Sequence, residues 1–206
     1  MTDTVPPAPN LRRIRVLLWI IVAFAIVAVG VMVLRGQSST SEGPATAQSS
    51  FGGPFTLVGP DGKPFSSAKL TAKPYAIYFG FTRCGDVCPT TLSRLVKLRK
   101  ESAGEKAFNI VFVTIDPAHD GPKEVGQYAG LFNSPIIGLT GSQAEIDRVK
   151  KQYGIFAQPS AHPMAGKEME HSAAVLLFDR NGKFVTTIAS DEPDPEALAK
   201  LKKLVA

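Results

Sequence analysis

The sequence predicts an α/β domain, in which helices flank a mixed β-sheet, behind one N-terminal membrane-spanning segment. Two continuous apolar runs, 75–81 and 109–115, are typical of strands covered on both faces, and helix-like segments follow both of them. A third run, 173–178, leads through the turn 179–182 into another strand, which predicts an antiparallel hairpin. This order of strands and helices favours a sheet sandwiched between helices.

The membrane segment is predicted at 16–34, which are nineteen residues without a charge. Arg12, Arg13 and Arg15 precede it and only Arg35 follows closely, so we expect 1–15 in the cytoplasm and the rest of the chain outside. A cleaved signal peptide is the alternative, because 45–47 matches a small-x-small cleavage pattern. Either way, we expect an exported domain that faces a bacterial periplasm from the inner membrane.

The remaining elements follow from periodicity and turn residues. The segment 35–50 is rich in small and polar residues and predicts a flexible tether, so the folded domain should span 51–206. Pro89 suits the first position of a helix, Ser142 and Glu145 form a capping box, and Asp194 suits an N-cap. In order, we expect strands at 55–58, 75–81, 109–115, 173–178 and 183–189, and helices at 89–101, 123–132, 142–153 and 195–204.

The charge distribution gives little support to nucleic-acid binding. The net charge is +5, of which residues 1–50 carry +2 and residues 51–206 carry +3. The basic residues form neither a run of like charges nor a stripe interleaved with aromatic residues.

The chain has two cysteines, Cys84 and Cys88, which lie between an apolar strand and a predicted helix. Their spacing is neither the Cys-x-x-Cys of a thioredoxin-type motif nor half of a four-thiolate zinc site. A helix N-terminus favours thiolate, so we expect a thiophilic metal site, a reversible disulfide or both. A stabilising disulfide is the alternative, although so short a loop removes little chain entropy.

Three histidines and two acids are further candidates. His119 lies in a turn-like segment and His162 in a proline-containing loop, whereas His171 directly precedes the third apolar run and could face a site. Asp86 lies between the cysteines, and Asp116 follows the second apolar strand. Either could be an outer-shell group that orients the histidine or adjusts the local charge, or it could be an ordinary turn residue.

Four segments resemble the Sco/SenC family of membrane-anchored, thioredoxin-like copper proteins. They are FGFTRCGDVCPTTL at 79–92, VFVTIDPAHDGP at 111–122, LTGS at 139–142 and HSAAVLLFDRNGKF at 171–184. The resemblance implies a thioredoxin-like fold that binds one copper ion through Cys84, Cys88 and His171. It also implies a role in building the binuclear copper centre of cytochrome c oxidase.

The resemblance leaves two functions open. The chain could be a copper chaperone for the copper-site subunit of the oxidase, which is not an enzyme in the turnover sense. Alternatively, it could be a membrane-anchored thiol-disulfide oxidoreductase that reduces the cysteines of that subunit or of other exported proteins. Other periplasmic copper carriers or thiol reductants are implied partners. A peroxidase is disfavoured because Thr82 precedes Cys84 by one residue too few for a Thr-x-x-Cys motif.

The chain departs from the family pattern at two places. Gly85 replaces the proline that commonly follows the first cysteine, which predicts a more mobile loop with altered copper affinity or a more readily formed disulfide. A Gly85→Pro variant with unchanged copper affinity and reduction potential would contradict this expectation. The residues before His171 also differ from the pattern, and there Met164 and Met169 could supply an axial thioether, although methionine more often fills a core.

Overall fold

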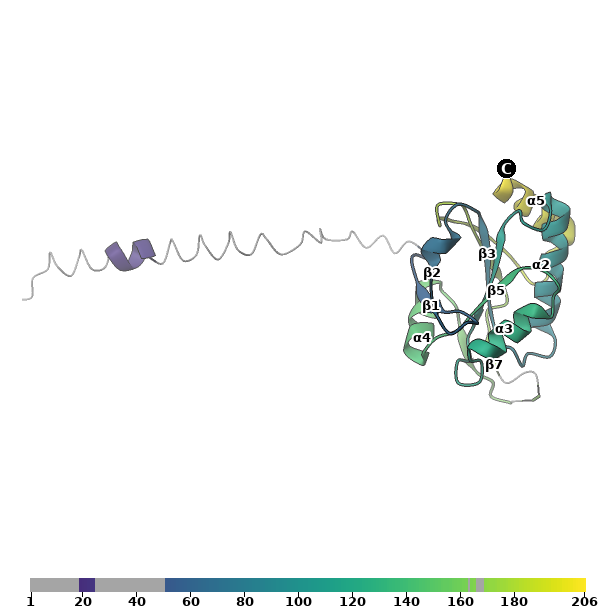
Figure 1. The fold of residues 1–206 in the computed structure, drawn as a ribbon, viewed down its shortest axis with the longest axis horizontal. Coiled ribbons are helices and arrows are strands. Elements are labelled where there is room, and N and C mark those ends of the chain that lie inside the picture. Colours follow the sequence, from purple (N-terminus) through teal and green to yellow (C-terminus); the bar gives the residue numbers. More distant parts are fainter. Residues whose placement is uncertain (1–18, 25–50, 163, 166–168) are drawn as a thin grey trace, which may run out of the picture. The chain divides into compact units, whose positions relative to one another are not determined.

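A five-stranded mixed sheet forms the centre of the domain in the computed structural model, which describes residues 19–24, 51–162, 164–165 and 169–206 (Figure 1). The strand order is β5-β4-β3-β8-β9, in which β3–β4 and β4–β5 pair in parallel, and β3–β8 and β8–β9 pair antiparallel. The strands are β3 (Tyr75–Gly80), β4 (Asn109–Thr114), β5 (Ile136–Leu139), β8 (Val175–Phe178) and β9 (Phe184–Ile188). The predicted fold class, a mixed sheet between helices, is therefore confirmed for this domain.

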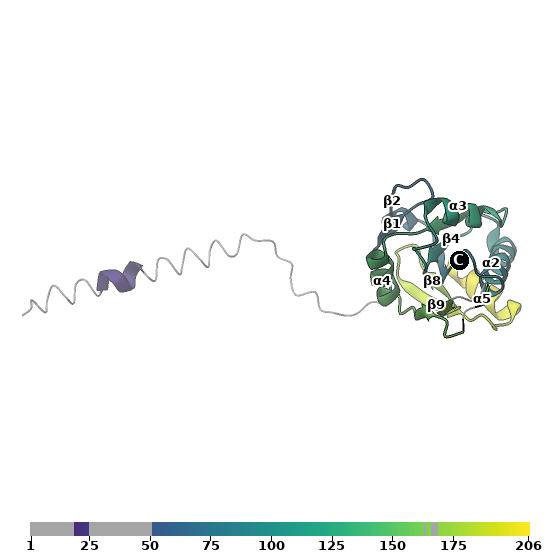
Figure 2. The same ribbon diagram turned by 90° about the horizontal axis from the view of Figure 1, so that it is seen from below.

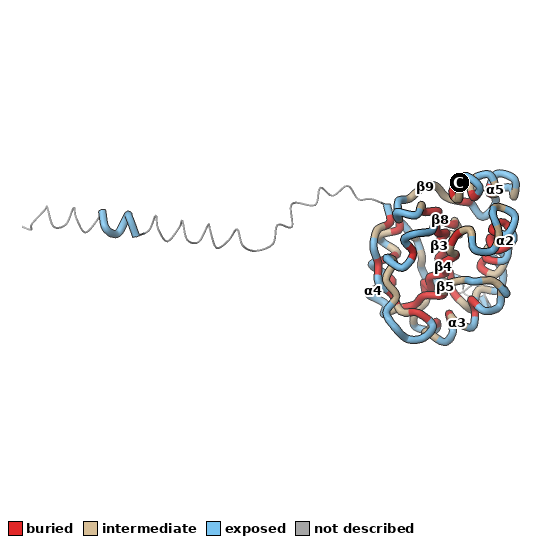
Figure 3. Tube along the Cα trace, turned by 45° about the horizontal axis from the view of Figure 1, so that its top comes forward, coloured by how far each residue is buried: buried red, intermediate tan, exposed pale blue. Residues whose placement is uncertain are grey.

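Helices cover both faces of this sheet. In Figure 3, α2 and α5 lie on one side of the strands and α4 on the other, while α3 lies beside β5. Figure 2 gives the same arrangement from below. Arg94 of α2 donates to the Asp194 carboxylate at 2.7 Å, which ties α2 to α5. The helices are α2 (Val87–Ala103), α3 (Pro122–Gly130), α4 (Gln143–Gln152) and α5 (Asp194–Val205).

The core lies along β3 and its neighbours. Every residue of β3 and β8 is buried, as are the last five residues of β4, which accounts for their continuous apolar sequences (Figure 3). Tyr78, Phe79 and Phe112 are completely buried. This packing makes the carboxyl end of β3 a rigid base for the loop that follows it.

Two small hairpins accompany the central sheet, and only the strand expected at 55–58, which is β1, was predicted from the sequence. The first pairs β1 (Thr56–Val58) with β2 (Pro64–Ser66) and continues into a short 3-10 helix, η1 (Ser67–Leu70). The second pairs β6 (Ala157–Pro159) with β7 (Met169–His171). The β6–β7 hairpin matters for function because it carries His171.

The predicted helix caps had different outcomes. The capping box is confirmed, since Glu145 N–H donates to Ser142 Oγ at 3.4 Å and Ser142 N–H donates to Glu145 Oε2 at 2.8 Å. The prediction of Asp194 as an N-cap is wrong, because Pro193 occupies that position and Asp194 lies in the first turn. The Asp194 carboxylate instead accepts hydrogen bonds from Arg94 and Lys97 of α2.

The N-terminal predictions fall mostly outside the described residues. Of the predicted span 16–34, only 19–24 are described, and they are helical and exposed. The described part of the chain holds no helix with the length and apolar character needed to cross a bilayer. The predicted cytoplasmic segment 1–15 and the whole of the predicted tether, 35–50, lie outside that part, so the anchor stays a prediction.

Candidate metal centre

The two cysteines lie where β3 passes into α2. Helix α2 begins at Val87, so Cys88 lies in its first turn and Cys84 in the preceding loop. The loop folds back on itself, since Cys84 N–H donates to the Phe81 carbonyl at 3.2 Å. Cys88 N–H in turn donates to Cys84 Sγ at 3.3 Å. An amide in the first helical turn therefore points at a sulfur, which favours negative charge there.

The two thiols have opposite tendencies to ionise. Both are free, Cys84 being half-buried and Cys88 fully buried. A hydrogen bond from the Cys88 thiol, helped by His171 and by the backbone amides of Asp86 and Cys88, lowers the pKa of Cys84 to about 4 against an opposing effect of burial. The same thiol pairing, together with burial, raises the pKa of Cys88. The metal-free pair is therefore a thiolate at Cys84 and a thiol at Cys88 at neutral pH.

His171 presents one ring nitrogen to these sulfurs. Its Nδ1 lies 2.9 Å from the Ser172 carbonyl, which can only accept, so Nδ1 donates this hydrogen bond and Nε2 is the nitrogen directed at the sulfurs. Nε2 lies 3.6 Å from Cys88 Sγ. Phe81 and Tyr78 pack edge-on against the imidazole, with ring centroids at 6.0 Å and 6.2 Å. The structure thus brings together the three side chains singled out in the sequence.

The spacing of the Cys88 and His171 donors suits one metal ion. A thiolate at about 2.3 Å and an imidazole nitrogen at about 2.0 Å from an ion, set about 120° apart, lie about 3.7 Å from each other. The observed separation of Sγ and Nε2 is 3.6 Å. Within the described residues, however, no group of three His, Cys, Asp or Glu side chains already has the spacing of a complete metal site.

Gly80, which sequence reasoning missed, makes room for the buried sulfur. A Cβ at this position would lie 2.9 Å from Cys88 Sγ, 3.1 Å from Tyr78 and 3.2 Å from Phe112. Any side chain would therefore push Cys88 or its neighbours aside. A glycine within an otherwise bulky apolar strand was the available signal, since it often marks a close approach.

Asp120 fixes the start of the cysteine loop and was also missed. This fully buried carboxylate accepts from Thr82 N–H at 2.9 Å, from the Thr82 hydroxyl at 2.6 Å and from the Thr114 hydroxyl at 2.6 Å. Thr82 lies two residues before Cys84 and Thr114 ends β4. The carboxylate thus ties the loop to the end of the neighbouring strand.

The two acids suggested as supporting groups do not bond to His171. Asp116 accepts from Arg83 at 2.8 Å and lies 3.0 Å from His119 Nδ1, so it positions the residue before Cys84. Asp86 occupies the N-cap of α2, where its side chain makes no capping hydrogen bond. His119 is exposed, as its turn-like sequence indicated.

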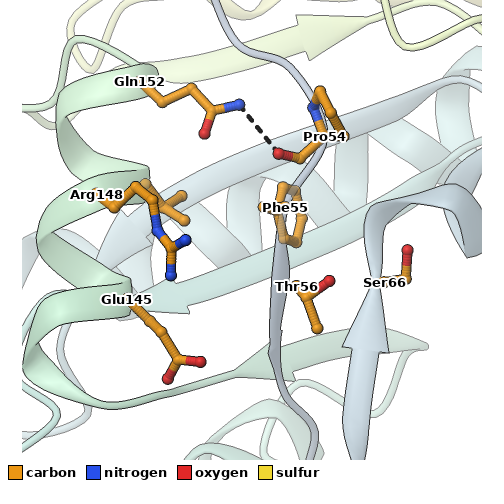
Figure 4. Close-up of a pocket in the computed structure, with 8 residues that line it drawn as sticks. Pro54, Phe55, Thr56, Ser66, Glu145, Arg148 and Gln152 are labelled. Carbon is orange, nitrogen blue, oxygen red and sulfur yellow. Dashed lines mark hydrogen bonds between the residues drawn. The ribbon is translucent and has the colours of Figure 1, made fainter. Parts of the chain in front are cut away.

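A pocket of about 460 Å3 opens over Cys84 and the His171 imidazole. It is lined by Phe81, Cys84, Asp86, Val87, Ser160, His162, Met164, Met169, Glu170, His171 and Ala173. A second depression, of about 300 Å3, lies beside α4, and there Gln152 Nε2 donates to the Pro54 carbonyl at 3.1 Å (Figure 4). Its lining contains neither cysteine nor histidine, so the first pocket is the candidate site.

These features define a class of protein: a thioredoxin-like domain whose strand–loop–helix junction holds two free thiols, one of which lines a pocket together with a histidine. The chain belongs to the SCO1/SenC family, because the model of that family matches residues 43–206.

Relatives of known sequence support this assignment. The chain is 33% identical over 154 residues to the mitochondrial protein SCO1 homolog 1 of Arabidopsis thaliana, covering 73% of this chain and 46% of that protein. It is 30% identical to the mitochondrial protein SCO2 of Saccharomyces cerevisiae, covering 84% and 59%. The SCO2-like protein of Rickettsia felis is 32% identical, with 89% and 94% covered. The chain thus spans about half the length of the first two relatives and nearly all of the third.

Solved structures of similar proteins contain copper. Copper-bound ScoI of Bradyrhizobium japonicum is 34% identical with a TM-score of 0.62, and the match covers 75% of this chain and 99% of that one. Copper-bound ScoI of Arabidopsis thaliana is 30% identical with a TM-score of 0.67, covering 75% and 98%. Two solved relatives of this chain therefore bind copper, and the thioredoxin-like fold expected from the resemblance is confirmed.

Proposed function

We propose that this protein binds one copper ion through Cys84, Cys88 and His171 and delivers it during assembly of the binuclear copper centre of cytochrome c oxidase. The observation that carries the proposal is the 3.6 Å approach of His171 Nε2 to Cys88 Sγ, between residues 83 positions apart in the chain. The hydrogen bond from Nδ1 to the Ser172 carbonyl fixes the orientation of the ring, with Nε2 directed at the sulfur.

The chemistry of the donors favours copper as cargo. Two soft sulfurs and one imidazole suit Cu(I), and a three-ligand site leaves a position open for a ligand of the recipient. The pocket exposes one side of the site, since Cys84 is half-buried and lines it. Ligands can then be exchanged one at a time with the copper-site subunit, which we propose as the recipient.

Anchoring follows from the sequence. The uncharged segment 16–34 would hold the domain on the periplasmic side of the bacterial inner membrane, with the N-terminus in the cytoplasm. There the domain could receive copper from periplasmic carriers and electrons from thiol reductants.

A second function has its own supporting observation. The thiol–thiol hydrogen bond gives Cys84 the low pKa of an attacking thiolate, as in thiol-disulfide oxidoreductases. In this role the thiolate would attack a partner disulfide, and Cys88 would then release the reduced partner as the Cys84–Cys88 disulfide forms.

A His171→Ala variant separates the two functions. Under the copper proposal, the variant loses at least about 10-fold in Cu(I) affinity. Removing only an outer-shell partner of a metal ligand already costs about 10- to 100-fold. Under the reductase proposal, it still reduces a disulfide substrate at close to the wild-type rate. The exposed His119→Ala variant is the matched control. Unchanged Cu(I) affinity in His171→Ala would refute the three-ligand site.

A further inference from the structure

The pocket over the cysteines contains a second set of soft donors at its mouth. His162, Met164 and Met169 line it together with Cys84 and His171. Met164 is 61% exposed, so it does not fill the core as most methionines do. Thioether sulfur and imidazole are both ligands that suit Cu(I).

The β6–β7 hairpin directs these side chains. Met169 and His171 are two residues apart in β7 and therefore lie on the same face of that strand. Met169 pairs with Pro159 and His171 with Ala157, which fixes both positions. Between them, the Glu170 carboxylate accepts from Gln158 at 3.3 Å and from Ser160 at 3.4 Å.

Ser160 also holds the outer end of this set. His162 N–H donates to Ser160 Oγ at 3.3 Å, so the backbone that carries His162 is tied to the same hairpin. His162 and Met164 are separated by one residue in the sequence, and both are exposed. Met169 therefore comes from strand β7 of the hairpin, and His162 and Met164 come from the segment between β6 and β7.

The donors that line the pocket, and Cys88 beside it, differ in burial. His162 and Met164 are exposed, Met169, His171 and Cys84 are partly buried, and Cys88 is completely buried. The two most exposed donors are the His162 imidazole and the Met164 thioether, and the most buried donor is the Cys88 thiol. An ion that enters from solvent meets His162 and Met164 first.

We infer that His162, Met164 and Met169 form a second Cu(I) site, which captures copper at the pocket mouth before Cys84, Cys88 and His171 take it. The inference rests on the proposed function in one respect, namely that the inner site receives copper. Transfer inward is an exchange of ligands: copper stays Cu(I), Cys84 binds as thiolate and Cys88 gives its proton to solvent. The outer site also holds copper while the cysteines form a disulfide, because none of its ligands is a thiol.

Selenium labelling tests the outer site directly. The full chain is produced with selenomethionine in a Cys84→Ser/Cys88→Ala background and loaded with one equivalent of Cu(I). We expect copper–selenium scattering in the X-ray absorption spectrum, and its loss when Met164 and Met169 are both changed to leucine, which preserves side-chain volume. No copper–selenium scattering, or scattering that persists in the leucine variant through Met1 or Met32, overturns the inference.

The chain with intact cysteines provides a second measurement should the background variant fail to fold. With two equivalents of Cu(I), the selenium-labelled protein should show copper–selenium scattering that Met164→Leu/Met169→Leu removes, and its absence overturns the outer site. Competition with a chromophoric Cu(I) chelator should show the weaker of two sites lost in His162→Ala and retained in His119→Ala. Both histidine variants behaving alike would count against His162 as a ligand.

The titration with two equivalents of Cu(I) also distinguishes a missing outer site from a wrong proposed function. If the first equivalent binds to sulfur of Cys84 and Cys88 but no second site exists, only the inference in this section fails. If no copper binds to the cysteines, the proposed function fails, whatever the methionines do.

Discussion

Replacing Gly80 with alanine tests how the fold positions the buried ligand. The new Cβ would lie 2.9 Å from Cys88 Sγ, 3.1 Å from Tyr78 Cε1 and 3.2 Å from Phe112 Cε2. Favourable contacts between heavy atoms need about 3.5–4.0 Å, so the sulfur has to move by roughly 0.6–1.1 Å if the rings stay in place. All three neighbours are completely buried and have little free space to move into.

Two effects of this change can be measured. Overpacking should lower the free energy of unfolding of the reduced, metal-free chain by about 1–3 kcal/mol, which urea titration detects. Displacing a ligand should lower Cu(I) affinity by at least about 10-fold, because even an outer-shell change has that effect. Gly130→Ala is the matched control, since a Cβ there has no neighbour within 4 Å, and this change at the end of α3 should lower neither quantity. Unchanged stability and affinity in Gly80→Ala would refute the argument from packing.

Two further predictions concern the cysteine loop. Asp120→Ala removes the carboxylate that accepts three hydrogen bonds. Thr82 N–H and the Thr114 hydroxyl then lose their acceptor, and each unsatisfied buried group costs roughly 1–3 kcal/mol. The free energy of unfolding should therefore fall by about 3 kcal/mol. A fall below about 0.5 kcal/mol, the usual range of a surface change, would show that the carboxylate does not brace the loop. The third prediction concerns the thiol of Cys84, whose pKa is lowered to about 4. In the metal-free chain it should react with iodoacetamide at a constant rate from about pH 6 to about pH 8. The rate for an ordinary thiol, with a pKa of about 8.5, rises roughly tenfold per pH unit at the start of that range. Cys88→Ala removes the main cause of the lowered pKa and should restore a rising rate, and a rising rate in the wild type would contradict the thiol pairing.

The central part of the fold could be predicted because its signals are local and strong. The strands β3 and β4 are buried on both faces and appear as unbroken apolar runs. The capping box of α4 is a short-range motif and was also recognisable. By contrast, β5 has four residues, and β6 and β7 have three each with mixed polarity, so neither length nor periodicity marked them.

The residues of the candidate site could be predicted from the sequence, but their arrangement in space could not. Cys84 and Cys88 were evident from their spacing, while His171 was singled out by position and by family resemblance. Its approach to Cys88 depends on the pairing of β7 with β6, which is a tertiary contact. The bond between Thr82 and Asp120 joins residues 38 positions apart and left no local signal in the sequence.

The most direct test of the account is the copper coordination of the inner site. The reduced full chain, loaded with one equivalent of Cu(I), is examined by X-ray absorption at the copper edge as wild type and as His171→Ala. We predict two sulfur ligands and one nitrogen ligand in the wild type, and loss of that nitrogen in the variant. A wild-type spectrum without a nitrogen ligand, or a His171→Ala spectrum identical to the wild type, would contradict a copper site formed by Cys84, Cys88 and His171.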